Sequence, residues 1–139
     1  MTTIAALRAW SAGSYSDTAV VELLARAFGG RFAGAGHPWI GTDAAGRTWL
    51  DGDALRAASG LSGGERRVLA LVAALIDLQP VEIVGVVSGL DRHHLDLVLA
   101  ALAYARGSHE HAAVVLDPDC TVDLSSLSPL HPWPAAGTR

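Results

Sequence analysis

The sequence predicts a mainly helical α+β domain, with about five helices and one β-hairpin. Three observations lead to this fold class. Apolar residues recur at helical spacing in several stretches, and two short aromatic segments flank a turn that contains glycine. The length of 139 residues also fits one domain with its own core. We expect that domain to span residues 1–124, followed by a Pro-rich tail over residues 125–139.

Two helices are expected at the N-terminus. The first follows Thr2 and closes near Gly13. The second starts after the capping residues 14–17, and its apolar positions follow one face as far as Phe28. Gly29-Gly30 then stands where a left-handed helix end is usually found.

A β-hairpin is expected over residues 37–50, because two short aromatic segments surround the turn at residues 42–46. We expect Trp39 and Trp49 to be near neighbours across the strands or to flank one face. Tryptophan is favoured in binding sites, which makes this pair the best candidate interaction surface. The alternative is that both rings belong to the core, because an isolated hairpin needs a hydrophobic cover.

The second half begins with a helix from Ser62 to just before Pro80, in which Ser62 and Glu65 form a capping box. Another helix follows residues 88–91 and ends at Gly107. Residues 81–87 fit either a buried strand or a short helix, and we favour helix because no nearby apolar run supplies a parallel partner. Residues 112–116 read as a short strand before the turn at 117–119, and the tail is expected to be mobile unless Trp133 docks on the domain.

Composition limits the possible functions. The formal net charge of −4 argues against binding to nucleic acid or to an anionic membrane surface. The strongly apolar stretch from Val68 to Ile76 is much shorter than a membrane span, and no signal-peptide pattern is present, so we expect a soluble cytoplasmic protein. Cys120 is the single cysteine, and no pattern marks it as a catalytic nucleophile.

One segment resembles a known family. Leu61-Ser62-Gly63-Gly64-Glu65 resembles the signature motif of ABC-type ATPases, and Ser88-Gly89-Leu90-Asp91 resembles their D-loop. The resemblance covers residues 61–119 and implies a degenerate C-terminal half of such an ATPase. It also implies that Ser62, Gly63 and Gly64 contact a nucleotide held by a partner ATPase, through backbone N–H groups at a helix N-terminus. The helix start at residues 64–67 also resembles small uncharacterised proteins of GC-rich bacteria, which implies no activity.

The departures from the ATPase pattern are severe. All ten basic residues are arginine, so the phosphate-binding lysine of a P-loop is missing, and no P-loop motif occurs. The stretch 80–88 lacks the Asp-Glu pair that would hold magnesium, and residues 116–118 replace the region of the switch histidine. We therefore expect no catalytic residues and no cofactor, and Ser62–Glu65 can equally be a plain helix cap.

A metal site is not expected. His93 and His94 are adjacent, so on a helix they point about 100° apart and cannot share one ion. His109 and His111 would share a face of a strand, but we interpret them as solvated loop residues. Turn formation and helix capping explain the carboxylate pairs at 51/53 and 117/119.

We therefore expect a non-catalytic protein-interaction or regulatory module that binds a protein partner or forms a homo-oligomer. The ATPase alternative requires residues 81–87 and 112–116 to be adjacent parallel strands. A third hypothesis, weak DNA binding through Arg66 and Arg67, requires these residues to share an exposed face with Arg56 and Arg92. Solvation, or ion pairs with Glu65 and Asp53, would explain Arg66 and Arg67 without DNA.

Overall fold

The computed structural model describes residues 1–136, with only the backbone at positions 123 and 124. It confirms the predicted α+β fold, which is mainly helical. The helices are α1 (Thr3–Ser11), α2 (Tyr15–Arg26), α3 (Gly52–Arg56), α4 (Gly63–Asp77), α5 (Ile83–Val87) and α6 (Arg92–Ala105), with 3-10 segments η1 (Ala27–Ala33) and η2 (Ser108–Glu110). The strands are β1 (Ile40–Thr42), β2 (Thr48–Leu50), β3 (Ala112–Leu116) and β4 (Val122–Ser126). They form two separate antiparallel hairpins, so the prediction of one hairpin was one too few.

The helix ends follow the predicted chemistry. Thr2, Ser14 and Asp51 each accept a backbone N–H of the first turn of α1, α2 and α3, respectively. Gly29 and Gly30 are left-handed, with φ of 68° and 76°, but they lie within η1 and not at the end of the helix as predicted, because α2 already ends at Arg26. Residues 83–87 form the helix α5, which confirms the interpretation of 81–87 as helical.

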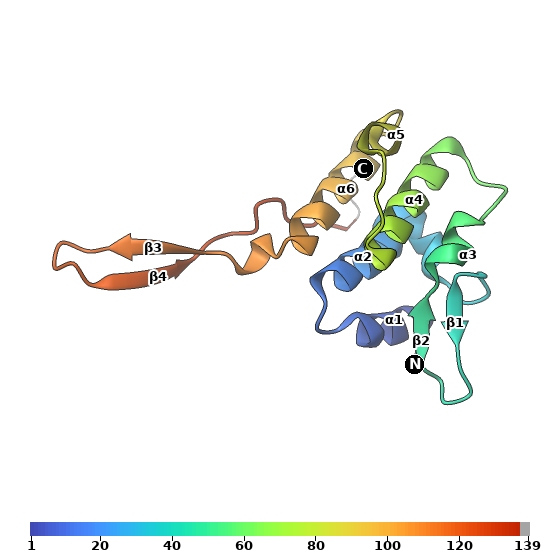
Figure 1. The fold of residues 1–139 in the computed structure, drawn as a ribbon, viewed down its shortest axis with the longest axis horizontal. Coiled ribbons are helices and arrows are strands. Elements are labelled where there is room, and N and C mark those ends of the chain that lie inside the picture. The colour runs from blue at the N-terminus through green and yellow to red at the C-terminus, as the bar shows by residue number, and fades with distance from the viewer. Residues whose placement is uncertain (137–139) are drawn as a thin grey trace.

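Helix α2 lies at the centre of the helical body, in contact with α1, α4 and α6 (Figure 1). Its side chains at 19–21 and 23–24 are fully buried, as a helix covered on several sides requires. The buried stripes of the neighbouring helices are at Val68, Leu69, Leu71 and Val72 on α4 and Leu97, Val98 and Ala101 on α6. We call this part of the chain, residues 1–110, the body.

The first hairpin is part of the body. Strand β2 packs against α1, and the register pairs Ile40 with Leu50 and Gly41 with Trp49. Leu50 and Thr48 are buried, whereas the Trp49 side chain lies over Gly41. A helix therefore covers this two-stranded sheet, which would be marginal alone.

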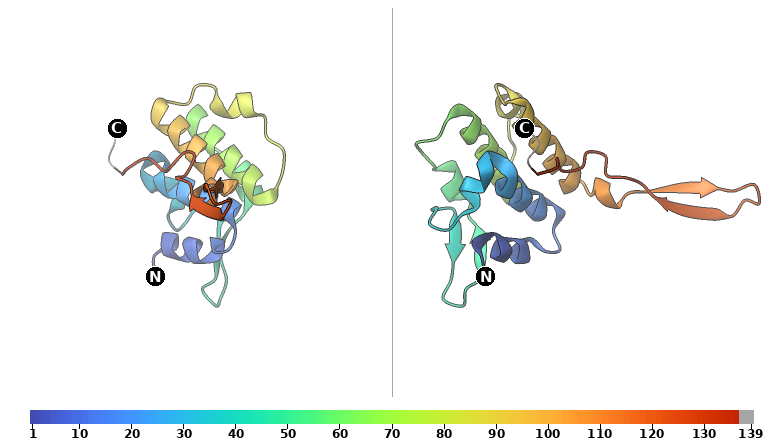
Figure 2. Two further views of the ribbon diagram at one scale, coloured as in Figure 1. Left: turned by 90° about the vertical axis from the view of Figure 1, so that its left-hand side faces the viewer. Right: turned by 180° about the vertical axis from the view of Figure 1, so that it is seen from behind.

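The second hairpin leaves the body. Strands β3 and β4 project from the end of α6 and η2, well clear of the helices in Figure 1 and in the right view of Figure 2. We call residues 111–127 the arm. After the arm the chain returns to the body, where Trp133 packs against the core and lies 5.0 Å from the Arg26 guanidinium. Trp133 therefore docks on the body, which is the case in which the tail was not expected to be mobile. Residues 137–139 of the predicted tail lie outside the described residues.

Candidate interaction surface

The arm exposes apolar side chains that nothing in the described chain covers. Val114, Leu116 and Val122 are each more than 60% exposed, and Val115 is 45% exposed. Both faces of β3 are apolar, since every residue from Ala112 to Leu116 is Ala, Val or Leu. Such continuous apolar runs are typical of strands that are covered on both faces. The arm is therefore the strongest candidate interaction surface of the molecule.

The tip of the arm is a tight turn organised by Asp117. Its Oδ1 accepts the N–H groups of Asp119 at 3.0 Å and Thr121 at 2.9 Å. The Cys120 N–H donates to the Asp117 carbonyl oxygen at 2.9 Å, and Cys120 has a left-handed φ of 60°. The carboxylate thus shapes the turn, as the sequence predicts for this acidic pair.

The loop between β1 and β2 has the same construction. Asp43 Oδ1 accepts the N–H groups of Ala45 and Arg47, both at 2.9 Å, and Gly46 is left-handed with φ of 80°. The backbone and side-chain hydrogen bonds from Arg47 lower the pKa of Asp43. Both hairpins therefore have the same kind of turn, in which the left-handed residue is Gly46 in the first hairpin and Cys120 in the second.

A second exposed apolar segment surrounds α5. Leu78 is 83% exposed and Val84 is 63% exposed, and Ile83 is also exposed. Only Val86 of this short helix is buried in the core. The segment is a smaller apolar surface on the body, away from the arm (Figure 1).

The signature-like segment is a helix cap. Ser62 Oγ accepts the Glu65 N–H at 3.2 Å, and Glu65 Oε1 accepts the Ser62 N–H at 2.8 Å, so the predicted capping box is present. Glu65 also forms an ion pair with Arg31 of η1. Gly63 and Gly64 occupy the first turn of α4. Residues 83–87 are helical and β3 pairs antiparallel with β4, so the parallel strands that the ATPase resemblance requires are not formed.

The two candidate tryptophans have different environments. Trp39 is only 4% exposed, stacks on His37 and donates its Nε1–H to the Phe32 carbonyl oxygen at 3.0 Å. It belongs to the core and is not available to a partner. Trp49 is 38% exposed and stays accessible on the hairpin.

Of the arginines that the DNA hypothesis names, Arg56 is held in ion pairs and Arg67 is only partly exposed. Arg56 is paired with Asp53 at 3.0 Å and Asp77 at 2.6 Å. Arg66 is exposed and Arg67 is half-buried. Of the two explanations without DNA, the exposure of Arg66 fits solvation, because Glu65 pairs with Arg31 and not with Arg66 or Arg67.

His94, in the first turn of α6, is packed against η1. Its ring stacks on Phe28 at 4.0 Å, and its Nε2 accepts the Phe28 N–H at 3.1 Å. Because Nε2 is an acceptor, Nδ1 carries the proton and donates to the Asp91 carboxylate at 2.9 Å. Asp91 also caps α6 by accepting the His94 backbone N–H, and these two hydrogen bonds lower the pKa of Asp91.

His109 is also packed, in an aromatic cluster at the base of the arm. It lies on η2, not on a strand, and its ring stacks on Tyr104 at 3.8 Å. Tyr15 contacts His109 edge-on and hydrogen bonds to Glu110, which raises the pKa of Tyr15. Among residues 1–136, no three His, Cys, Asp or Glu side chains come together in a group that could hold a metal ion.

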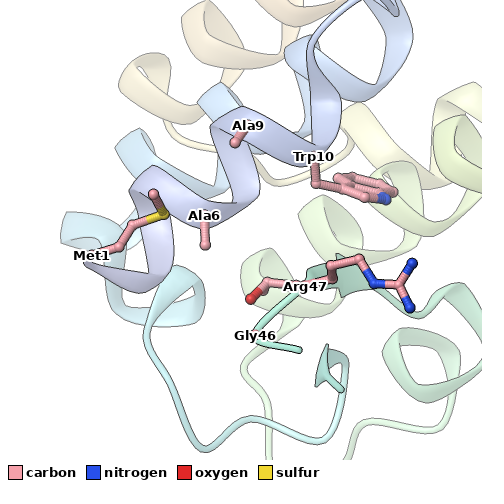
Figure 3. A pocket seen from close by; sticks show the side chains of 7 residues that line it. Met1, Ala6, Ala9, Trp10, Gly46 and Arg47 are labelled. Carbon is pink, nitrogen blue, oxygen red and sulfur yellow. The ribbon is translucent and has the colours of Figure 1, made fainter. Parts of the chain in front are cut away.

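Two of the pockets have mostly apolar linings. One, of about 350 Å³, lies between α1 and the loop of the first hairpin, with Trp10 and Arg47 among its lining residues (Figure 3). Arg47 is already engaged with Asp43 at 2.7 Å. Another, of about 210 Å³, lies between η2 and the tail beside Trp133. Neither is lined by a nucleophile paired with a base.

Comparison with protein-family models, with curated proteins and with solved structures found no match to this chain. No helix within residues 1–136 has both the length and the apolar character needed to cross a membrane.

The hairpin formed by residues 111–127 was not predicted from the sequence. The strand at 112–116 and the turn at 117–119 were expected, but the strand β4 was not. The signal for it was the alternation of Val122 and Leu124 with polar residues directly after the turn.

Proposed function

We propose that this chain is a non-catalytic protein-interaction module that presents the arm to a protein partner. The observation that carries this proposal is the exposure of an apolar two-stranded hairpin outside the body. A hairpin of this size is marginally stable in water when nothing covers it. A partner that buries Val114 and Leu116 would stabilise the arm and gain binding free energy from the same apolar area.

The alternative, contact of Ser62–Gly64 with the nucleotide of a partner ATPase, has less support. The Ser62 and Glu65 N–H groups at this helix end already donate within the capping box. Glycine and serine at a helix start are explained by the cap itself.

The test compares capture of proteins from a native lysate by three forms of the chain. The double variant Val114→Thr/Leu116→Thr has β-branched residues, which favour a strand, at both positions but removes apolar area from the arm. Leu99→Gln, at a position that is 43% exposed on α6, is the matched control. We expect the wild type and Leu99→Gln to retain the same protein, and the arm variant to lose it. Equal retention by all three forms would show that the arm is not the binding element.

A further inference from the structure

We propose that the partner of the arm is a second copy of this chain, joined edge to edge through β3 in an antiparallel pair centred on Val114. This inference rests on the proposed function, in which the arm is the interaction element. It adds the identity of the partner, the strand that pairs and the register of the pairing.

The hydrogen bonds of the hairpin show which backbone groups face outward. The Asp117 N–H donates to the Thr121 carbonyl oxygen at 3.2 Å, and the Leu127 N–H donates to the His111 carbonyl oxygen at 3.0 Å. Along an antiparallel pair, hydrogen-bonded positions alternate with positions whose groups point away from the neighbouring strand. The N–H and C=O groups of Ala112, Val114 and Leu116 therefore lie on the open edge of β3.

This edge is complementary to itself. The three outward residues are evenly spaced about Val114, so a second β3 running antiparallel can place its own Val114 opposite this one. Ala112 then lies opposite the second copy's Leu116, and Leu116 opposite its Ala112. Every outward N–H of β3 meets an outward C=O in this register, and no other antiparallel register uses all of them.

Residue types favour the β3 edge over the β4 edge. Proteins usually protect an exposed edge strand with charge or proline, and β3 contains neither. The sequence of β4 includes Asp123, Ser125 and Ser126. A wholly apolar edge strand without such protection is expected to be paired.

The same register brings a carboxylate close to an imidazole, which has a ring N–H to donate. It places the exposed Asp117 opposite the second copy's exposed His111 at each end of the paired strands. It also keeps the two acidic tips, each with Asp117 and Asp119, at opposite ends of the sheet. A tip-to-tip arrangement would bring these carboxylates together, because residues 107–138 contain no Arg or Lys.

The size of the contact sets the expected affinity. Stable dimers bury roughly 800 Å² on each partner, and a strand of five residues supplies less. The dimer is therefore expected to be reversible, with a population that rises with protein concentration.

The first test is sedimentation velocity over a range of concentrations with a matched pair of proline variants. Proline at 114 removes an N–H on the open edge of β3 and leaves the hydrogen bonds of the hairpin intact. Val122→Pro makes the same change on the open edge of β4. We expect wild type and Val122→Pro to dimerise and Val114→Pro to stay monomeric. Loss of the dimer in Val122→Pro alone, or a wild type that is monomeric throughout, would overturn the proposal.

The second test leaves the backbone unchanged and uses Cys120, the single cysteine, at the tip of the arm. A spin label there should report a distance of roughly 30 Å between copies, from a rise of about 3.3 Å per residue on each side of Val114. A much shorter distance would mean tip-to-tip contact and would refute the register.

The two proposals fail separately. The chain could be monomeric while the Val114→Thr/Leu116→Thr variant fails to capture a lysate protein that the wild type captures. That result would refute pairing with a second copy and support the interaction module. If arm variants change neither self-association nor capture, both proposals are wrong.

Discussion

Replacing Cys120 by glycine is expected to stabilise the arm and leave the body unchanged. Cys120 has a left-handed φ of 60° at the tip of the arm, where its side chain crowds its own backbone. Gly46 occupies the equivalent position in the first hairpin, with φ of 80°. Glycine adopts this conformation without steric strain.

The size of the effect follows from two opposing terms. A left-handed residue other than glycine costs about 1–2 kcal/mol. Glycine raises the entropy of the open arm, which reduces the gain by about 0.4–1 kcal/mol. Values near the middle of the two ranges leave a net stabilisation of about 0.5–1 kcal/mol, which corresponds to a roughly two- to fivefold smaller population of the open arm.

Amide hydrogen exchange measures this effect, because the arm opens without unfolding the body. We expect amides of β3 and β4 that face each other to exchange roughly two- to fivefold more slowly in Cys120→Gly. The reverse change, Gly46→Cys, is the matched control, since a Cβ at Gly46 meets no atom within 4 Å and only the backbone strain is added. It should speed exchange in the first hairpin. Unchanged exchange in both variants would refute the strain argument.

Three further predictions concern the body and the tail. Leu97→Ala should lower the free energy of unfolding by about 2–5 kcal/mol in urea titrations, because Leu97 is 1% exposed, whereas Leu99→Ala, at 43% exposure, should change it far less. Asp91→Asn should destabilise the protein at neutral pH. Because the pKa of Asp91 is lowered in the folded state, its carboxylate stabilises the protein above the ordinary value of 3.8, and this stability is lost as the pH falls through the folded pKa. The urea midpoints of the wild type and the variant should therefore converge in acid. Trp133→Ala removes the ring beneath the Arg26 guanidinium, and limited proteolysis should then cut the tail faster while the body resists.

The fold class and the helix ends could be predicted because their signals are local. The capping box of Ser62 and Glu65 and the cap that Ser14 gives to α2 depend on neighbours within a few residues. The apolar spacing of α4 likewise determines which of its faces is buried. The strand β4 was missed because it is short and half polar, so that its pairing with β3 decides its conformation.

The environments of candidate side chains were harder to predict, because contacts distant in sequence decide them. His94 is 66 residues from Phe28, whose N–H it accepts, and no spacing rule connects the two. Glu65 is paired with Arg31 of η1, although Arg66 and Arg67 are nearer in sequence. Burial of Trp39 and exposure of Trp49 depend on how the first hairpin docks on the body.

A comparison of the two hairpins supports the proposal that the arm binds a partner. Both have a turn in which an aspartate accepts two backbone N–H groups and a left-handed residue closes the loop. The first is covered by α1 and buries Leu50. The second exposes Val114, Leu116 and Val122, although its β3 is the more apolar strand. The first hairpin is thus stabilised by its cover, and in the proposed function another molecule supplies the corresponding cover to the second.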